Sequence, residues 1–322
     1  MNDMNQNDNR ISRRDALGLG VAAAVGASLP SVGHSANFFK SQNLPIGLQL
    51  YTVADAARKD LSGSFERLAK IGFKAIELAG YHGHSPAELK SAADKNGLKF
   101  TGIHLSDISR DGMEPGLADA GKLASQMRAL GIEEVTMPIM PFPEGFAPGK
   151  DEPFRDFLIR ASAKMDKSYY QKMAALLNQR GAALAKEGLR FSYHNHNLEF
   201  APIGNTTGWD ILVAETDPKS VSFEMDAGWV AAAGLDPVAT VRKLSGRVRQ
   251  MHVKDIKAST KANYTLTQDP TEVGSGSLKW AEILPVAHAA GVRHFYVEQE
   301  PPFTMDRFDA IAKSLRYLSG LA

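Results

Sequence analysis

The segment 248-VRQMHVK-254 is an apolar, strand-like run that ends in two polar residues one position apart, His252 and Lys254. Residues i and i+2 of a strand point to the same face, so both side chains point the same way from the end of the strand. Three more runs in this half of the chain end in such pairs: His194 and His196, Glu224 and Asp226, Glu298 and Glu300. We therefore expect four strands whose ends bring polar side chains together.

Similar runs extend towards the N-terminus and alternate with amphipathic, helix-like segments from residue 45 onward. The expected strands are Ile46–Tyr51, Ala75–Ala79, Phe100–Leu105, Glu134–Met140, Arg190–His196, Val221–Asp226, Val248–Lys254 and His294–Glu300. Eight strands alternating with helices predict an α/β fold, a (β/α)₈ TIM barrel in a single domain over residues 37–322. A doubly wound open sheet is the alternative, but it would show fewer strands, and no GxGxxG motif follows the first run.

The first 36 residues differ in composition from the rest of the chain. Arg13 and Arg14 precede the short apolar run Ala16–Leu29, which is rich in alanine and glycine. A twin arginine before a weakly hydrophobic core resembles a bacterial Tat export signal. We interpret residues 1–36 as a removed signal, which predicts a periplasmic protein with no membrane span after processing. The lack of cysteine fits an oxidising compartment.

The net charge of +1, without a long basic stretch, gives no electrostatic footprint for nucleic acid, so we expect no nucleic-acid partner. A homo-oligomer stays possible on sequence alone.

Three of the strand-end residues form a candidate metal site. Asp226, His252 and Glu298 end neighbouring strands of the predicted barrel, and carboxylate and imidazole groups are ligands for ions such as Mn²⁺, Zn²⁺ or Co²⁺. Each residue alone also has a structural interpretation, for example as a helix cap or a buried core group. Their concentration at successive strand ends favours the metal site, because unpaired buried charges are costly.

Several motifs together carry a resemblance to a known family. They are 193-YHNH-196 with 199-EF-200, 225-MDAGW-229, 251-MHVKD-255, 273-VGSG-276 with Trp280, and 297-VEQE-300. These motifs resemble the sugar phosphate isomerase/epimerase family, the xylose isomerase-like TIM barrels, over roughly residues 45–320. The resemblance implies one divalent metal ion (Mn, Co, Zn or Fe), held by Glu, Asp, His and Glu from strands five to eight.

Asp226, His252 and Glu298 match the last three ligands that the resemblance implies. At strand five the family has a glutamate where this chain has His194. Either His194 is the fourth ligand, or Glu199 reaches back from the following loop. We favour Glu199, because it restores three carboxylates and one imidazole.

The remaining polar side chains at the strand ends are expected to bind a small sugar substrate by hydrogen bonds or stacking. They are Gln49, Glu77, His104, Trp229, Lys254 and Glu300. Gln49 could equally be a filler of the barrel interior.

The resemblance implies a metal-dependent isomerase or epimerase that acts on a keto-sugar or related polyol through an enediolate, with His194, His196 and Glu298 as catalytic residues. A histidine pair can also act first as base and then as acid to a leaving group. The first alternative is therefore a 3-keto-glycoside lyase or hydratase working by β-elimination, after oxidation of the sugar by a partner oxidoreductase. The second alternative is a non-catalytic periplasmic sugar-binding barrel.

Overall fold

In the computed structural model of the chain, residues 37–109 and 114–321 are described. The expected export signal, residues 1–36, lies outside the described residues. No helix in the described ranges is long and apolar enough to cross a membrane.

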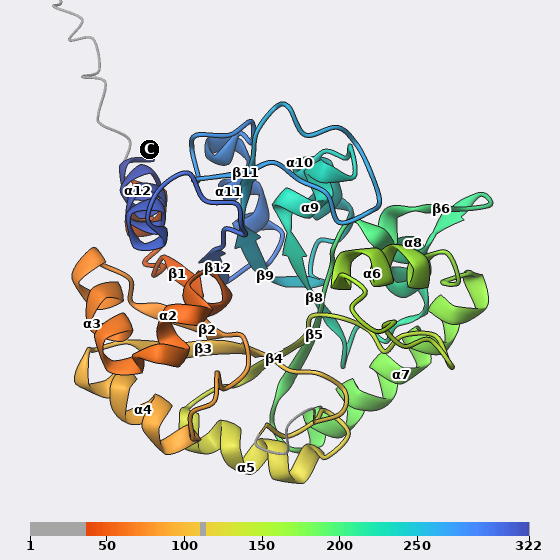
Figure 1. Cartoon of the computed structure of the whole chain (residues 1–322), viewed down its shortest axis with the longest axis horizontal. Coiled ribbons are helices and arrows are strands. Elements are labelled where there is room, and N and C mark those ends of the chain that lie inside the picture. Colours follow the sequence, from red (N-terminus) through yellow and green to blue (C-terminus); the bar gives the residue numbers. More distant parts are fainter. Residues whose placement is uncertain (1–36, 110–113, 322) are drawn as a thin grey trace, which may run out of the picture. The chain divides into compact units, whose positions relative to one another are not determined.

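The described residues contain a closed parallel barrel of eight strands in the order β1-β12-β9-β8-β5-β4-β3-β2 (Figure 1). The strands are β1 (Gly47–Gln49), β2 (Ala75–Leu78), β3 (Lys99–His104), β4 (Glu134–Met137), β5 (Arg190–His194), β8 (Ser222–Asp226), β9 (Val248–Val253) and β12 (His294–Val297). Each overlaps one expected run, so the predicted (β/α)₈ fold is confirmed. Most strands end earlier than expected. After β5, β9 and β12, the polar residues that were assigned to the strand ends already belong to loops.

Helices surround the barrel on its outside (Figure 1). The main ones are α3 (Leu61–Ile71), α4 (Pro86–Lys95), α5 (Ala120–Leu130), α7 (Lys167–Lys186), α8 (Gly208–Glu215), α10 (Pro237–Lys243), α11 (Trp280–Ala289) and α12 (Arg307–Gly320). The other helices are α1 (Phe38–Ser41), α2 (Ala54–Lys59), α6 (Phe154–Ser162) and α9 (Ala227–Ala232), with the 3₁₀ turns η1 (Leu50–Val53) and η2 (Leu198–Phe200).

Local sequence signals start and stop these helices. Ser85 caps α4 and forms a reciprocal capping box with Glu88, while Pro86 occupies the first helical position. Gly131 follows α5 with φ 75°, a left-handed conformation that glycine adopts without steric cost. The alternation of helix and strand thus follows from the sequence at both helix ends.

The inward positions of the strands are occupied by polar side chains as well as apolar ones. On β2, for example, Glu77, which pairs in register with Gln49 of β1, is fully buried in the barrel, whereas the adjacent Ile76 points to the opposite face and belongs to the hydrophobic core. Core layers of this fold are commonly filled by branched apolar residues, so a polar interior needs hydrogen-bond partners for every group. These partners make up the site described below.

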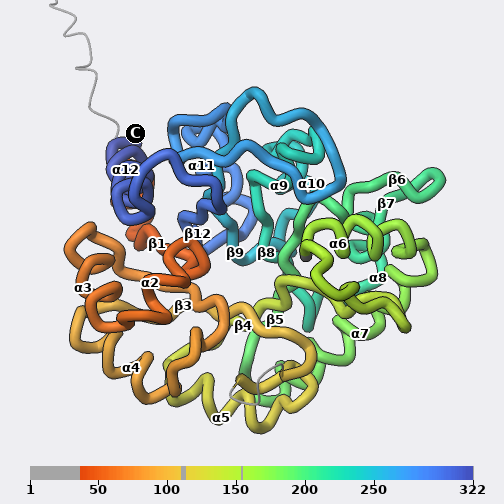
Figure 2. Tube along the Cα trace, in the orientation of Figure 1, coloured from red at the N-terminus to blue at the C-terminus, as the bar shows by residue number. Residues whose placement is uncertain are grey.

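Two long segments follow the carboxyl ends of β4 and β9, and both can be traced in Figure 2. The first, residues 138–166, contains α6. The second, residues 257–279, follows β10 (Asp255–Ile256) and contains its antiparallel partner β11 (Pro270–Thr271). Arg155 donates a hydrogen bond to Thr267 (2.6 Å), so the two segments touch. A small hairpin, β6 (Pro202–Ile203) with β7 (Thr206–Thr207), precedes α8.

Candidate functional site

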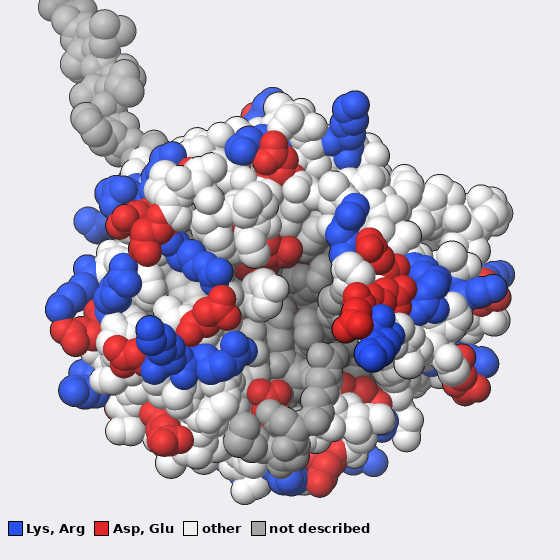
Figure 3. Space-filling model, viewed as in Figure 1, with Lys and Arg blue, Asp and Glu red and all other residues white. Residues whose placement is uncertain are grey.

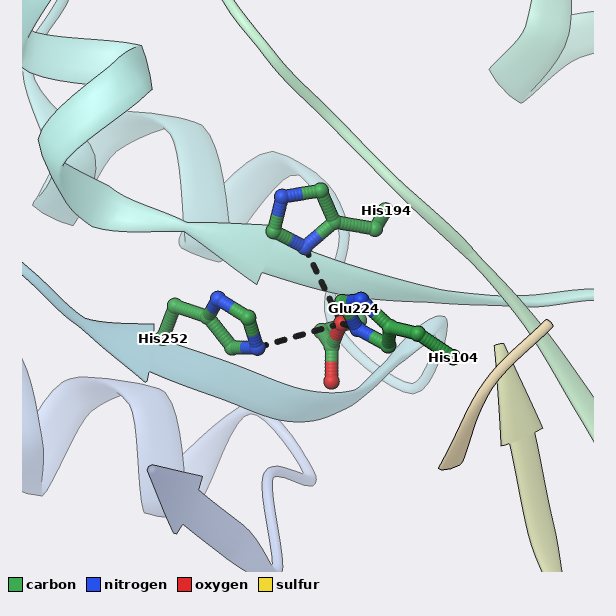
Figure 4. Close-up of side chains that lie close together, drawn as sticks. All are labelled: His104, His194, Glu224 and His252. Carbon is green, nitrogen blue, oxygen red and sulfur yellow. Dashed lines mark hydrogen bonds and ion pairs between the residues drawn. The ribbon is translucent and has the colours of Figure 1, made fainter. Parts of the chain in front are cut away.

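Glu224 lies at the centre of a buried group of histidines that come from three other strands (Figure 4). Its Oε2 atom is 2.6 Å from His104 Nε2, 3.0 Å from His194 Nδ1 and 3.3 Å from His252 Nε2. The four residues offer ligand atoms that all lie within 4.8 Å of one another. We call His104, His194, Glu224 and His252 the inner group.

His252 links the inner group to a second set of carboxylates. Its Nε2 atom lies 2.8 Å from Glu77 Oε2, and its Nδ1 atom lies 2.8 Å from Glu298 Oε2. Asp226, His252 and Glu298 also offer ligand atoms within 4.8 Å of one another, and we call them the outer group. The structure thus brings together the three residues that the sequence predicted as ligands of one metal ion.

Asp226 serves two purposes with its two carboxylate oxygens. Its Oδ1 atom accepts the backbone N–H of Trp229 (2.9 Å) and so caps α9. Its Oδ2 atom is buried and forms an ion pair with Lys254 Nζ (2.8 Å), but it accepts no well-directed hydrogen bond from the described residues. A buried carboxylate oxygen in this state can accept a metal ion, so the donor set of the outer group fits a divalent cation.

Lys254 is buried among the carboxylates of the outer group. Its Nζ atom lies 2.8 Å from Asp226 Oδ2, 2.8 Å from Glu298 Oε2 and 2.6 Å from Glu300 Oε1. It also lies 5.1 Å from the centre of the Trp229 ring, within reach of a cation–π contact. The ammonium group therefore neutralises charge at the place where a metal ion would bind.

The charges of the outer group follow from these contacts. Burial alone would lower the pKa of Lys254, but Asp226, Glu298 and Glu300 outweigh it and hold that pKa well above the ordinary value. Burial would raise the pKa of Glu298, yet Lys254 and His252 outweigh it and hold it well below the ordinary range. Both groups are charged at neutral pH.

The two histidines of the YHNH motif are neutral in this environment. Burial, reinforced by nearby His252, lowers the pKa of His194 to about 3. Burial and His194 also lower the pKa of His196 well below its ordinary value. Both residues are unprotonated at neutral pH and can accept a proton, but their lowered pKa values make them weak bases until a substrate changes their surroundings.

His104 has the opposite tendency. Burial alone would lower its pKa, but Glu77 and Glu224 outweigh burial and raise it. His104 and His196 both line one cavity, so it presents one histidine that tends to carry a proton and one that does not.

Gln49 and Glu77 lie in the barrel interior. Gln49 Nε2 donates to Glu77 Oε2 (2.9 Å), and Gln250 Nε2 donates to Glu77 Oε1 (3.1 Å). Burial, followed by the charge of Glu224, raises the pKa of Glu77 to about 8. Both residues are fully buried, and neither lines the cavity.

Glu199 is buried in η2, directly after β5. It accepts hydrogen bonds from the Tyr193 hydroxyl and from the backbone N–H of His196 (2.9 Å). It belongs to neither the inner nor the outer group. His194 Nε2, by contrast, lies 3.9 Å from Asp226 Oδ2.

The cavity has a volume of about 540 Å³. Of the residues singled out from sequence, its walls include His104, His194, His196, Trp229, Lys254, Glu298 and Glu300. Acidic and basic side chains are interspersed over this face of the molecule, without a large patch of one sign (Figure 3).

Sequence reasoning did not single out Arg155, Leu158 and Leu266, which also line the cavity. All three lie in the long segments after β4 and β9, outside any strand. The polar-pair pattern that revealed the strand ends does not extend to loops. The length of the segment after strand four is the signal that could have drawn attention to two of them.

Comparisons with known proteins agree with this architecture. A family model described as xylose isomerase-like TIM barrel matches residues 65–321. An inosose dehydratase of Geobacillus thermodenitrificans is 28% identical over 156 residues, which cover 44% of this chain and 51% of that protein. The chain thus aligns with about half the length of this curated relative.

Solved structures show the same fold. A sugar phosphate isomerase/epimerase from Parabacteroides distasonis has a TM-score of 0.68 at 21% identity, covering 86% of this chain and 95% of that chain. A xylose isomerase-like TIM barrel protein from Mycobacterium smegmatis, in complex with magnesium, has a TM-score of 0.57 at 17% identity, covering 88% and 99%.

Proposed function

The chain belongs to the xylose isomerase-like TIM barrel family, and from that premise we propose that it is a divalent-metal-dependent isomerase or epimerase of a keto-sugar or related polyol. The observation that carries the proposal is the outer group: Asp226, His252 and Glu298 converge on one point beside a cavity of about 540 Å³. A cavity of this size holds a sugar-sized ligand with room to spare.

Asp226, His252 and Glu298 would hold the ion, with His194 as the fourth ligand. His194 is favoured over Glu199 because its Nε2 atom lies near Asp226 Oδ2, whereas both Glu199 oxygens already accept hydrogen bonds. A bound Mn²⁺, Co²⁺, Zn²⁺ or Fe²⁺ supplies Lewis acidity to a substrate carbonyl. Glu224 contacts His194 and His252 and would orient both rings.

The side chains on the cavity walls suit proton transfer next to that carbonyl. Neutral His196 accepts the proton from the adjacent carbon, which gives an enediolate. The Lys254 ammonium stabilises the negative charge that develops on oxygen. His104, whose pKa is raised, returns a proton to another carbon or another face, which completes isomerisation or epimerisation.

A second candidate is β-elimination, by a dehydratase or a 3-keto-glycoside lyase. It is favoured by the likeness to an inosose dehydratase and by the two histidines, since one can remove the proton and the other can protonate the leaving group. A partner oxidoreductase would supply the keto-glycoside.

The metal site is tested by elemental mass spectrometry on protein purified without chelator. We expect about one divalent ion per chain in the wild type and in Glu199→Gln, and loss of that ion in His252→Ala and Asp226→Asn. Loss in Glu199→Gln with retention in His194→Ala would instead make Glu199 the ligand at strand five. A wild type that takes up no ion on titration would remove the Lewis-acid mechanism and favour a non-catalytic sugar-binding barrel.

The reaction is tested by NMR of keto-sugars incubated with the metal-loaded protein in D₂O. Deuterium next to the carbonyl together with a new sugar supports isomerisation or epimerisation. Release of water or an aglycone supports elimination. The absence of both deuterium exchange and product, in a protein that holds metal, would contradict the proposal.

We further propose that residues 1–36 direct export to the periplasm through the Tat route. The test is fractionation of cells that express the full chain, with Arg13→Lys and Arg14→Lys combined as the blocked variant. Equal periplasmic amounts of both proteins would contradict this.

A further inference from the structure

We infer that the substrate carries an apolar, preferably aromatic, substituent on its sugar ring, as in a glycoside with an apolar aglycone. The binding wall for that substituent is formed by Ile139, Leu158 and Leu266. This inference rests on the proposed function and specifies its substrate class.

The cavity lining combines polar and apolar side chains. His196, Lys254 and Glu298 suit a carbonyl and hydroxyl groups, and Arg155 adds a further charged group. Ile139, Leu158 and Leu266 have side chains that offer a hydroxyl group no hydrogen bond. A bare sugar would leave this apolar wall without a matching surface, whereas an apolar substituent would displace water from it.

Leu266 is held in the cavity wall by a specific arrangement. Its φ is 54°, a left-handed conformation that is unfavourable for leucine. Its backbone N–H donates to Asn197 Oδ1 (3.1 Å), and Asn197 Nδ2 donates to the carbonyl of Asn263 (2.9 Å). Asn197 is fully buried and directly follows His196, so the proposed base and the apolar wall are fixed by the same segment.

Leu266 also connects two hydrophobic clusters. It packs against the cluster of Phe157, Leu158 and Ala161 and also against the cluster of Trp229, Ala232 and Ile256. The apolar surface is therefore continuous from α6 to α9, and Trp229 brings it to the edge of the outer group. A strained residue that completes a continuous apolar wall at a cavity suggests a role in ligand binding.

A smaller cavity of about 30 Å³ extends the apolar character of the wall. It shares Ile139, Leu158, His196 and Leu266 with the main cavity and is further lined by Phe142 and Met165. The apolar lining thus continues behind the wall, next to the proposed base.

The inference is tested by isothermal titration calorimetry with pairs of phenyl and methyl glycosides, the β-D-glucopyranosides and β-D-galactopyranosides. These unoxidised sugars cannot enolise, so binding is measured without turnover. We expect each phenyl glycoside to bind at least about 10-fold more tightly than its methyl counterpart, because more apolar surface is buried. Equal affinities, or no binding of either phenyl glycoside, would overturn the inference.

A variant of Leu266 tests whether the preference for phenyl glycosides comes from the apolar wall. Asparagine tolerates the left-handed conformation better than leucine, so Leu266→Asn keeps the backbone while it removes the apolar side chain. We expect the phenyl advantage to fall by about 5-fold in Leu266→Asn, because phenyl glycoside affinity should drop more than methyl glycoside affinity. The matched control is Leu235→Asn, at an exposed leucine that does not line the cavity.

Equal weakening of both glycosides in Leu266→Asn would show that the variant disturbs the whole site and would overturn the assigned wall. Failure of the proposed function would give a different result. The protein would then catalyse no deuterium exchange on keto-sugars, whether or not it binds phenyl glycosides more tightly.

Discussion

Lys254 is a buried cation placed between carboxylates that would also hold a metal ion. Its ammonium contacts Asp226, Glu298 and Glu300 at 2.6–2.8 Å. Removing one partner of a buried ion pair leaves uncompensated charge, which is strongly destabilising. Lys254 and a divalent ion therefore serve overlapping electrostatic purposes in the outer group.

We predict that Lys254→Met lowers the free energy of unfolding of metal-free protein by about 3–5 kcal/mol. Part of this loss should be recovered with Mn²⁺, because the ion restores positive charge beside Asp226 and Glu298. Urea unfolding in EDTA and in Mn²⁺ measures both values.

The matched control is Lys257→Met, which removes a partly exposed ion pair with Asp269 (3.0 Å). Surface pairs contribute about 0–1 kcal/mol, and this one has no reason to respond to Mn²⁺. An equal loss for Lys254→Met in EDTA and in Mn²⁺ would separate Lys254 from the metal site.

His82 is buried outside the site, and its Nε2 atom has no hydrogen-bond partner among residues 37–109 and 114–321. Burial, helped by Arg58, lowers its pKa to about 4. Because the folded-state pKa lies below the unfolded value of about 6.5, the unfolded chain binds the proton more readily. His82 therefore makes the protein less stable as the pH falls from about 6.5 towards 4.

We predict that His82→Asn flattens this part of the pH–stability curve, by up to about 3 kcal/mol at pH 4. Asparagine tolerates the positive φ of this position (53°), so the backbone is retained. Urea unfolding at several pH values gives the curves for both proteins, and parallel curves would contradict the assignment.

Asp255 stabilises the long segment between β9 and α11. Its carboxylate accepts the backbone N–H groups of Gly274, Gly276 and Leu278 (2.9–3.3 Å), and also the indole N–H of Trp280 (3.0 Å). This segment carries Leu266 and reaches the cavity, so one buried carboxylate organises a loop that builds the site.

We predict that Asp255→Asn lowers the free energy of unfolding by about 2–3 kcal/mol, because several donors lose an acceptor. Hydrogen exchange should accelerate at the amides of Gly274, Gly276 and Leu278. Asp236→Asn is the control, since Asp236 caps α10 through a single bond to Val238 and its loss should leave those three amides unchanged.

The strands were predictable because the sequence of each one shows the two-residue alternation of a strand and a polar residue at its end. His252 and Lys254 illustrate this, since a two-residue spacing on an apolar run fixes both the face and the end of β9. Leu266 illustrates the opposite case, because its place depends on Asn197, 69 residues away, and loop contacts follow no period.

Glu199 stays a prediction as the ligand at strand five, and its surroundings show why sequence alone does not decide between it and His194. Charge balance among expected ligands favoured it for the metal, but its oxygens accept the N–H of His196 and the hydroxyl of Tyr193. Such bonds depend on which way a turn directs a side chain, and residue type alone does not specify that direction.

Closure of the barrel depends on a close approach between its first and last strands. Gly47 of β1 pairs with Tyr296 of β12 and with Ala75 of β2. A β-carbon at position 47 would lie 2.5 Å from Tyr296 Cδ1 and 3.0 Å from the carbonyl oxygen of Phe295. Tyr296 is fully buried and its hydroxyl donates to Thr101 (3.0 Å), so its ring cannot easily move away.

We therefore predict that Gly47→Ala lowers the free energy of unfolding by about 1–3 kcal/mol, through overpacking at the seam that closes the barrel. Gly121→Ala is the matched control, because that exposed glycine in α5 has nothing within 4 Å of an added β-carbon and should be neutral or slightly stabilised. In a Tyr296→Leu background the cost of Gly47→Ala should fall, since the smaller side chain leaves room, and a double-mutant cycle from urea unfolding measures this coupling. A full, additive cost in that background would mean that the strain at Gly47 does not come from the Tyr296 ring.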